Sequence, residues 1–218
     1  MLDHILLLIG YTIVAMFWLA MVFLVRAAYR GVRARRWSRV LGFLGIAIAL
    51  ATGGLFLGLT PGSAAFYRYL DTRSYFGRGF FLGSPYLSYD SPRFFSGDGY
   101  SIEVFRISDS LARWASSPPA TFTTEYPLKP SYRSHWTSLH WCPTPVAAED
   151  RKLLDFALES TESDTDVLAA QTLLKRLANE TGNYISAFYF MHGDSVGNVD
   201  LFLLSPGEHI LIRVNFNT

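Results

Sequence analysis

Cysteine and charge are both scarce in this sequence. Cys142 is the single cysteine among the 218 residues, so no disulfide can form within the chain and a folded domain must be held by its own core. Only 17% of the residues are charged, whereas 50% are hydrophobic. This hydrophobic fraction is larger than a soluble chain usually needs, and we expect part of it to face lipid.

Acidic and basic residues are missing altogether from two long runs. Residues 5–25 and residues 40–60 each comprise 21 residues without Asp, Glu, Lys or Arg. At about 1.5 Å per residue, a helix of this length crosses a hydrocarbon core of roughly 30 Å. A cleaved signal peptide would place basic residues before a shorter apolar core, but Asp3 and His4 come first here. We therefore predict two membrane spans, the first of them a retained anchor.

The lack of acidic and basic side chains within both runs argues against a proton relay, an ion path or a transporter. The second run carries Gly54 and Gly58 at G-x-x-x-G spacing, which lets two helix backbones approach closely. We predict that this pair packs the second span against the first. A homodimer through the second span, or a foreign partner, is the alternative.

Arginine is concentrated between the two runs. Residues 26–39 contain six arginines and no acid, and the first basic residue after the second run is Arg68. By the positive-inside rule this loop is cytoplasmic, which places both termini and everything after residue 60 outside. The loop could also bind anionic head groups. Because only three of the 19 basic residues are Lys, a bias that hints at a GC-rich bacterial genome, we read the outside as the periplasm.

The sequence predicts three regions: a transmembrane hairpin at residues 1–60, an aromatic juxtamembrane segment at residues 61–96, and a periplasmic domain at residues 97–218. The middle segment is rich in Phe and Tyr, which favour a membrane surface, and we expect a short helix near residues 64–70. Residues 61–218 contain 13 basic and 17 acidic residues, a net charge of −4. Nucleic-acid binding is therefore not expected.

Hydrophobic periodicity gives the domain an α+β pattern, so the predicted fold class is a membrane-anchored α+β protein. Alternation and turn residues predict strands at residues 100–107, 133–142, 184–191, 199–204 and 209–216. Helical spacing predicts helices at residues 109–114, 147–159 and 164–180, with residues 120–132 extended. We expect one antiparallel sheet of about five strands with two or three helices on one face.

Residues 193–197 read Gly-Asp-Ser-Val-Gly and match the G-x-S-x-G nucleophile elbow. An elbow needs a strand before the serine and a helix after it. The following residues are strand-like, and a β-hairpin turn accounts for the Gly, Asp and Ser equally well. Glu103 and Glu125 lie in unrelated segments, so no spacing rule pairs them as glycosidase carboxylates.

His135, His140 and Cys142 are candidate metal ligands. Zinc sites need at least three protein ligands that converge on one point. On a strand, His140 and Cys142 would share a face while His135 would point to the other. We expect neither a metal nor a cofactor.

Aromatic and basic residues are dense between residues 126 and 141. Side chains of these kinds dominate protein interfaces. Strand alternation would put Trp136 on one face with His140 and Trp141 on the other with Arg133, so at most one face would be core. We predict a partner-binding patch made of Tyr126, Tyr132, Arg133, Trp136, His140 and Trp141.

These features favour a non-enzymatic inner-membrane protein whose periplasmic domain binds a protein partner. The most specific form of this hypothesis is an immunity protein that neutralises a bacterial toxin acting in the periplasm or on the membrane. The alternative is an assembly, accessory or sensor subunit of an envelope complex. A sensor usually needs an output domain, and a 14-residue loop at residues 26–39 is too short for one.

Overall fold

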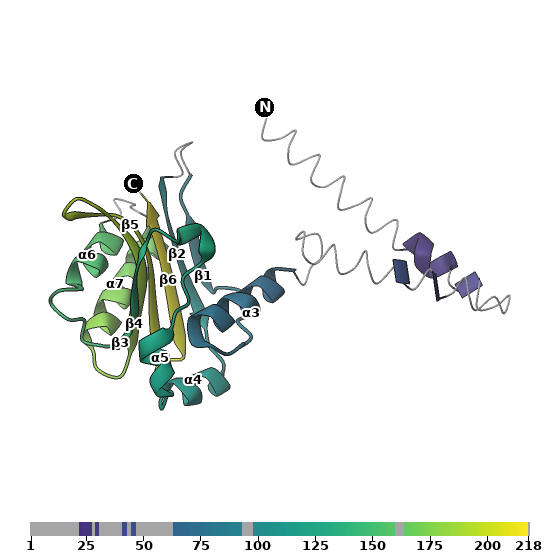
Figure 1. Cartoon of the computed structure of the whole chain (residues 1–218), viewed down its shortest axis with the longest axis horizontal. Helices are drawn as coiled ribbons and strands as arrows, with labels where there is room; N and C mark the ends of the chain where they lie inside the picture. Colours follow the sequence, from purple (N-terminus) through teal and green to yellow (C-terminus); the bar gives the residue numbers. More distant parts are fainter. Residues whose placement is uncertain are drawn as a thin grey trace. The chain divides into compact units, whose positions relative to one another are not determined.

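The computed structural model describes residues 22–27, 29–30, 41–42, 45–46, 63–92, 98–159 and 164–217 (Figure 1). The chain divides into two compact units, Met1–Tyr67 and Arg68–Thr218. Most of the two predicted spans, together with Gly54 and Gly58, lies outside the described residues. Within the described part of the chain, no helix has the length and apolar character needed to cross a membrane.

The second unit is built on one six-stranded antiparallel sheet, in the order β1-β2-β6-β5-β4-β3 (Figure 1). The strands are β1 (Leu87–Asp90), β2 (Gly99–Arg106), β3 (Thr137–Pro143), β4 (Tyr184–His192), β5 (Ser195–Ser205) and β6 (Ile210–Asn217). The predicted antiparallel α+β domain is confirmed. The additional strand is β1, a four-residue edge strand. The residues around it are rich in Pro and Ser, so hydrophobic alternation did not predict it.

Helices lie between the strands and before them. They are α3 (Ser63–Phe76), α4 (Asp109–Ala115), α5 (Ala120–Glu125), α6 (Arg151–Leu158) and α7 (Thr165–Asn179), with a 3-10 turn at Ser131–Arg133. Two of them have side-chain N-caps: the Ser108 hydroxyl accepts from the N–H of Leu111, and the Asp164 carboxylate accepts from two N–H groups of α7. The predicted extended conformation of residues 120–132 was wrong at α5, where Pro119 starts a six-residue helix.

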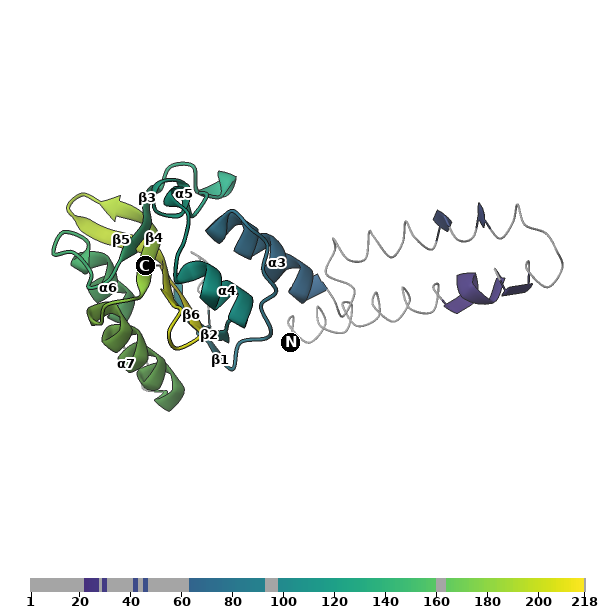
Figure 2. The same ribbon diagram turned by 90° about the horizontal axis from the view of Figure 1, so that it is seen from below.

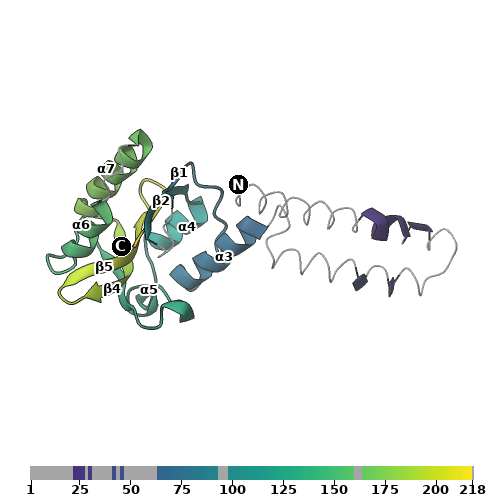
Figure 3. The same ribbon diagram turned by 90° about the horizontal axis from the view of Figure 1, so that it is seen from above.

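Helices cover both faces of the sheet, so the prediction that they lie on one face was wrong. Helices α6 and α7 lie on one side and α3, α4 and α5 on the other (Figures 2 and 3). The reason is visible in the central strands: Ile212 and Leu211 of β6 point to opposite faces, and both are buried. A sheet that is apolar on both faces must be covered on both.

The face under α3, α4 and α5 is packed with aromatic rings. The indole of Trp141 stacks against the rings of Phe76 and Phe122, at centroid distances of 5.6 and 5.3 Å, and these two rings also contact each other at 6.3 Å. The carbonyl groups at the end of α3 have long-range donors: Trp141 Nε1 donates to the oxygen of Tyr75 at 2.7 Å, and the N–H of Leu128 donates to that of Ser74 at 2.8 Å. These bonds tie the end of α3 to the sheet.

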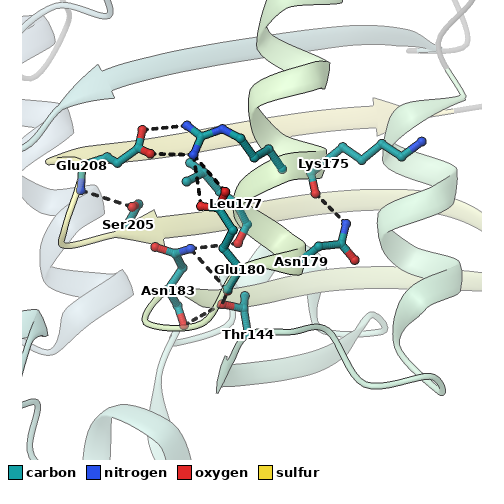
Figure 4. Close-up of polar contacts among 9 residues, drawn as sticks. Thr144, Lys175, Leu177, Asn179, Glu180, Asn183, Ser205 and Glu208 are labelled. Atoms are coloured by element: carbon teal, nitrogen blue, oxygen red, sulfur yellow. Dashed lines mark hydrogen bonds and ion pairs between the residues drawn. The ribbon is translucent and has the colours of Figure 1, made fainter.

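On the opposite face, the joint between α7 and β4 is held by polar side chains (Figure 4). The buried Asn183 amide donates to the carbonyl oxygen of Leu177 at 2.8 Å, and the Thr144 hydroxyl donates to that of Glu180. The N–H of Thr144 also donates to the oxygen of Asn183 at 3.0 Å. The end of α7, the end of β3 and the start of β4 are thereby fixed together.

Candidate functional site

The predicted patch is divided between core and surface. Trp136 is 6% exposed and Trp141 is 1% exposed, and both belong to the apolar cluster under α3, α4 and α5. The predicted alternation fails because the pairing of β3 with β4 shifts register between Leu139 and Cys142. A bulge of this kind reverses the in-out order beyond it, so two tryptophans of opposite parity reach the same face. The prediction that they lie on different faces was wrong.

Tyr126 lies beside His140 and Trp141 of the edge strand β3. The carbonyl oxygen of Tyr126 accepts from the N–H of Trp141 at 3.0 Å and lies 3.3 Å from Nδ1 of His140. The ring of Tyr126 lies over Gly77, where a Cβ would come within 2.4 Å of it. These contacts are part of the packing between α3 and β3. The side chain of Tyr132 is not among the described groups.

Arg133 contacts a residue outside the predicted patch and belongs to a different site. Its guanidinium lies over the Trp136 ring, 3.7 Å from the centroid. The same guanidinium holds Asp200 of β5 by two contacts, Nε to Oδ2 at 2.7 Å and Nη2 to Oδ1 at 3.1 Å. This forked geometry fixes the carboxylate in direction as well as in distance. Asp200 also accepts from the Asn215 amide of β6.

Asp200 lies in a cavity of about 370 Å³ on the sheet face that also carries α3. We call this cavity the polar groove. It is lined by Tyr75, Ser101, Glu103, Pro130, Arg133, Phe188, Asp200, Phe202, Arg213, Val214, Asn215 and Asn217. Its sheet residues come from β2, β4, β5 and β6, and the others come from α3 and from the segment before β3.

The polar residues of the floor are neighbours across the strands. Glu103 of β2 is paired with Arg213 of β6, and Asp200 of β5 is paired with Asn215 of β6. Opposite charges and amides at such positions attract each other across the ladder. The same face of β6 is apolar at Leu211 and polar from Arg213 onward, so the sheet face changes from core to groove along one strand.

Arg213 occupies the centre of the charge network. Its Nη1 lies 3.4 Å from Asp71 of α3 and 3.6 Å from Glu103, and its guanidinium lies 5.6 Å from the centroid of the Tyr75 ring. Burial lowers the pKa of Arg213, but Tyr75 and the surrounding carboxylates raise it more, so the guanidinium stays charged.

Asp71 has a pKa above its ordinary value, because burial disfavours its charged form by more than the nearby Arg213 and Arg68 favour it. The groove and its rim hold three carboxylates, those of Asp71, Glu103 and Asp200, and two guanidinium groups, those of Arg133 and Arg213. Arg68 is a third guanidinium group near Asp71, so the charges balance once it is counted. A cationic group that entered the groove would be attracted by the partly exposed carboxylates of Asp71 and Glu103, and the aromatic wall of Tyr75 would contact its apolar stem.

The groove was not found from the sequence, although β6 carried a signal for it. Arg213, Asn215 and Asn217 alternate with apolar residues in a strand that the pattern placed inside the domain. Three polar side chains on one face of a central strand need partners from other elements. Those partners come from β5, the strand before β6 in the chain, and from α3 and β2, which are distant in sequence.

Gly193 and Asp194 of the Gly193–Gly197 motif form the tight turn between β4 and β5, as the hairpin interpretation predicts, and the other three residues belong to β5. Gly193 has a φ of 61°, and His192 is paired with Ser195. Ser195 opens strand β5 instead of a helix, so the strand-turn-helix geometry of a nucleophile elbow is not formed here.

The three candidate metal ligands have other contacts. Cys142 Sγ lies 3.5 Å from the carbonyl oxygen of Ile185, and the His135 ring packs edge-on against Phe190. Burial, together with the charge of Asp150, raises the pKa of the Cys142 thiol to about 11. Among the residues that the structure describes, no three His, Cys, Asp or Glu side chains are grouped for a metal ion.

No protein family model matches this chain, and neither a curated protein nor a solved structure matches it. The polar groove and the apolar runs are therefore the features that bear on the class of protein.

Proposed function

We propose that this chain is a two-pass protein of the bacterial inner membrane whose Arg68–Thr218 unit binds a protein partner in the periplasm. The polar groove is the observation that carries the proposal. It is a charged depression with aromatic walls, set in a sheet that is otherwise buried on both faces. Arg, Tyr and aromatic side chains of this kind are enriched where proteins recognise each other.

The membrane part of the proposal rests on the two charge-free runs and on the arginines between them. The described helical residues in and beside these runs support it, because their apolar side chains are exposed within the first unit: Val22, Phe23 and Leu41 have exposed fractions of 54%, 65% and 66%. Two membrane spans would have such side chains covered by lipid.

The groove favours a partner that presents a Lys or Arg side chain. Two of its carboxylates can be reached from outside, since the Asp71 and Glu103 side chains are 42% and 34% exposed. Arg213 lies 3.4 and 3.6 Å from them, so their exposed oxygens could accept further charge-assisted hydrogen bonds from a partner's cation. Asp200 would not be its ligand, because Arg133 and Asn215 already hold that carboxylate.

The most specific form of the proposal is an immunity protein that captures a toxin at the outer surface of the membrane. Such a protein needs a membrane anchor, a rigid recognition surface and a partner made in the same cell or by its neighbours. The gene neighbourhood offers an inexpensive check, since an adjacent gene for a secreted toxin is the expected arrangement.

A competition assay tests this function. A strain that lacks the gene is grown with donor cells that secrete the neighbouring toxins, and the gene is then returned as the wild type or as a variant. We expect the wild type and the exposed-surface control Glu149→Gln to restore survival, and the double variant Asp71→Asn, Glu103→Gln to restore it poorly at equal protein level. Survival of the deletion strain against every such donor would refute the immunity function.

A further inference from the structure

Phe81 is the most exposed large apolar side chain of the described residues, and its neighbours are buried. Its exposed fraction is 77%, whereas those of Phe80 and Leu82 are 7% and 3%. Burial alternates along these three residues: two side chains are in the core and the one between them is in solvent. Phe81 is therefore turned outward by the packing of the residues on either side of it.

Hydrogen bonds hold this segment firmly against α3. The buried Thr72 hydroxyl accepts from the N–H of Phe80 at 2.9 Å and lies 2.8 Å from the carbonyl oxygen of the same residue. Nε of Arg68 donates to the carbonyl oxygen of Leu82 at 3.3 Å. The backbone on both sides of Phe81 is thus bonded to the helix, and the exposure of its ring is a built feature of the unit.

Two residues of α3 add exposed apolar surface near Phe81. The Tyr69 ring lies 5.2 Å from the Phe81 ring, and Leu70 is 39% exposed. The Tyr69 ring also fits over Gly79, where a Cβ would come within 2.3 Å of it. We call Tyr69, Leu70 and Phe81 the aromatic tip.

We propose that the aromatic tip inserts into the outer surface of the lipid bilayer and seats the Arg68–Thr218 unit on the membrane. This inference rests on the proposed membrane anchoring. The connection is short: only residues 61 and 62 lie between the end of the second predicted run at residue 60 and Ser63, where α3 begins. Whatever the conformation of these residues, three peptide steps to Ser63 and six helical steps to Tyr69 can span at most about 20 Å.

The chemistry of the tip fits the boundary between head groups and acyl chains. Tyr and Phe rings are favoured there, where the ring is buried and a polar edge stays wet. Arg73 and Arg78 are exposed and lie between Leu70 and Phe81 in sequence, and their guanidinium groups can bind lipid phosphates. A basic and aromatic surface next to a span therefore favours lipid over a soluble partner as its cover.

The experiment uses the full chain reconstituted into vesicles of phosphatidylethanolamine and phosphatidylglycerol. A Cys142→Ser background leaves one new cysteine for an environment-sensitive fluorophore, placed by Phe81→Cys, Leu168→Cys or Leu50→Cys in turn. Leu168 is a matched control, since it is also exposed, at 50%, but lies on α7 across the sheet. Leu50 reports on the predicted second span. Near-ultraviolet circular dichroism checks that each variant is folded.

We expect lipids with a spin label near the head group to quench the fluorophore at position 81 at least about threefold more than at position 168, with the label at position 50 quenched by deeper spin labels. No quenching at position 81 while position 50 is quenched would overturn the inference and leave the anchoring intact. Equal quenching at positions 81 and 168 would also overturn it. No quenching at position 50 would overturn the anchoring, and the inference with it.

Discussion

Replacement of Trp141 separates a core role from a binding role. The indole is 1% exposed, stacks against both Phe76 and Phe122, and donates a 2.7 Å hydrogen bond to the carbonyl oxygen of Tyr75. A buried indole removes on the order of 200 Å² from water, which corresponds to about 5 kcal/mol at about 25 cal/mol per Å². Measured losses for Trp→Ala in cores are about 3–5 kcal/mol. We expect Trp141→Ala to lower the free energy of unfolding by about 4 kcal/mol.

Trp141→Phe divides this loss into its two parts. Phenylalanine retains most of the stack but cannot donate to Tyr75, so we expect a loss of about 1–2 kcal/mol from the orphaned carbonyl at the end of α3. Leu168→Ala is the matched surface control, and it should change stability by less than about 0.5 kcal/mol.

The assay is urea unfolding of the full chain in detergent, followed by near-ultraviolet circular dichroism, which reports on packed aromatic rings. The three variants should rank Leu168→Ala, Trp141→Phe and Trp141→Ala in order of increasing loss. The reasoning would be refuted if Trp141→Ala unfolded within about 1 kcal/mol of the wild type, since the ring would then not be part of the core.

Three further predictions concern single sites in the same unit. Asp200→Ala should destabilise the unit by about 3 kcal/mol because it leaves the half-buried Arg133 without its carboxylate, and an Arg133→Met, Asp200→Leu double variant should recover most of that loss in the same urea assay. Gly77→Ala should lower the free energy of unfolding by more than about 1 kcal/mol, since φ is 70° there and the new methyl group would meet the Tyr126 ring. Gly207→Ala is the control, because the space around Gly207 is open. Equal melting temperatures for the two variants would contradict the argument. The Cys142 thiol, with a pKa of about 11 against 9.0 for an unperturbed group, should react with iodoacetamide at pH 8 about 100-fold more slowly than a peptide thiol, and reaction at the peptide rate would show that the thiol is not buried.

The secondary structure of the domain was largely predictable because its elements are strongly periodic. The strands at β4, β5 and β6 and the helices α6 and α7 were anticipated within a few residues, since alternation and helical spacing are local properties. Helix α5 and strand β1 were missed because both are short and their residues have no clear period. The second layer of helices was missed because Leu204 and Leu211 were not recognised as a separate apolar face.

The candidate site was less predictable than the fold. A dense aromatic segment reads the same way whether its rings face solvent or core, and here the bulge in β3 turned both Trp136 and Trp141 inward. Arg133 was singled out, but as a surface residue instead of as the partner of Asp200, which is 67 residues away in sequence. Contacts over such distances depend on register and on topology, and neither can be read from a local pattern.

The polar residues of the groove occupy positions where apolar residues would extend the core. Apolar side chains at Glu103, Arg213 and Asn215 would continue the aromatic core along β2 and β6, and replacing ion pairs by well-packed apolar groups is often neutral or stabilising. The present arrangement instead keeps Asp71 with a raised pKa, so this carboxylate is charged at some expense in burial energy. Polar residues thus replace apolar core residues at one place on an otherwise apolar sheet face. The proposed role in partner binding accounts for this replacement, whereas stability alone does not. The same reasoning makes pH a test: a cationic partner should be released as Asp71 takes up a proton, and release should begin at a higher pH than the ordinary aspartate value of 3.8 allows.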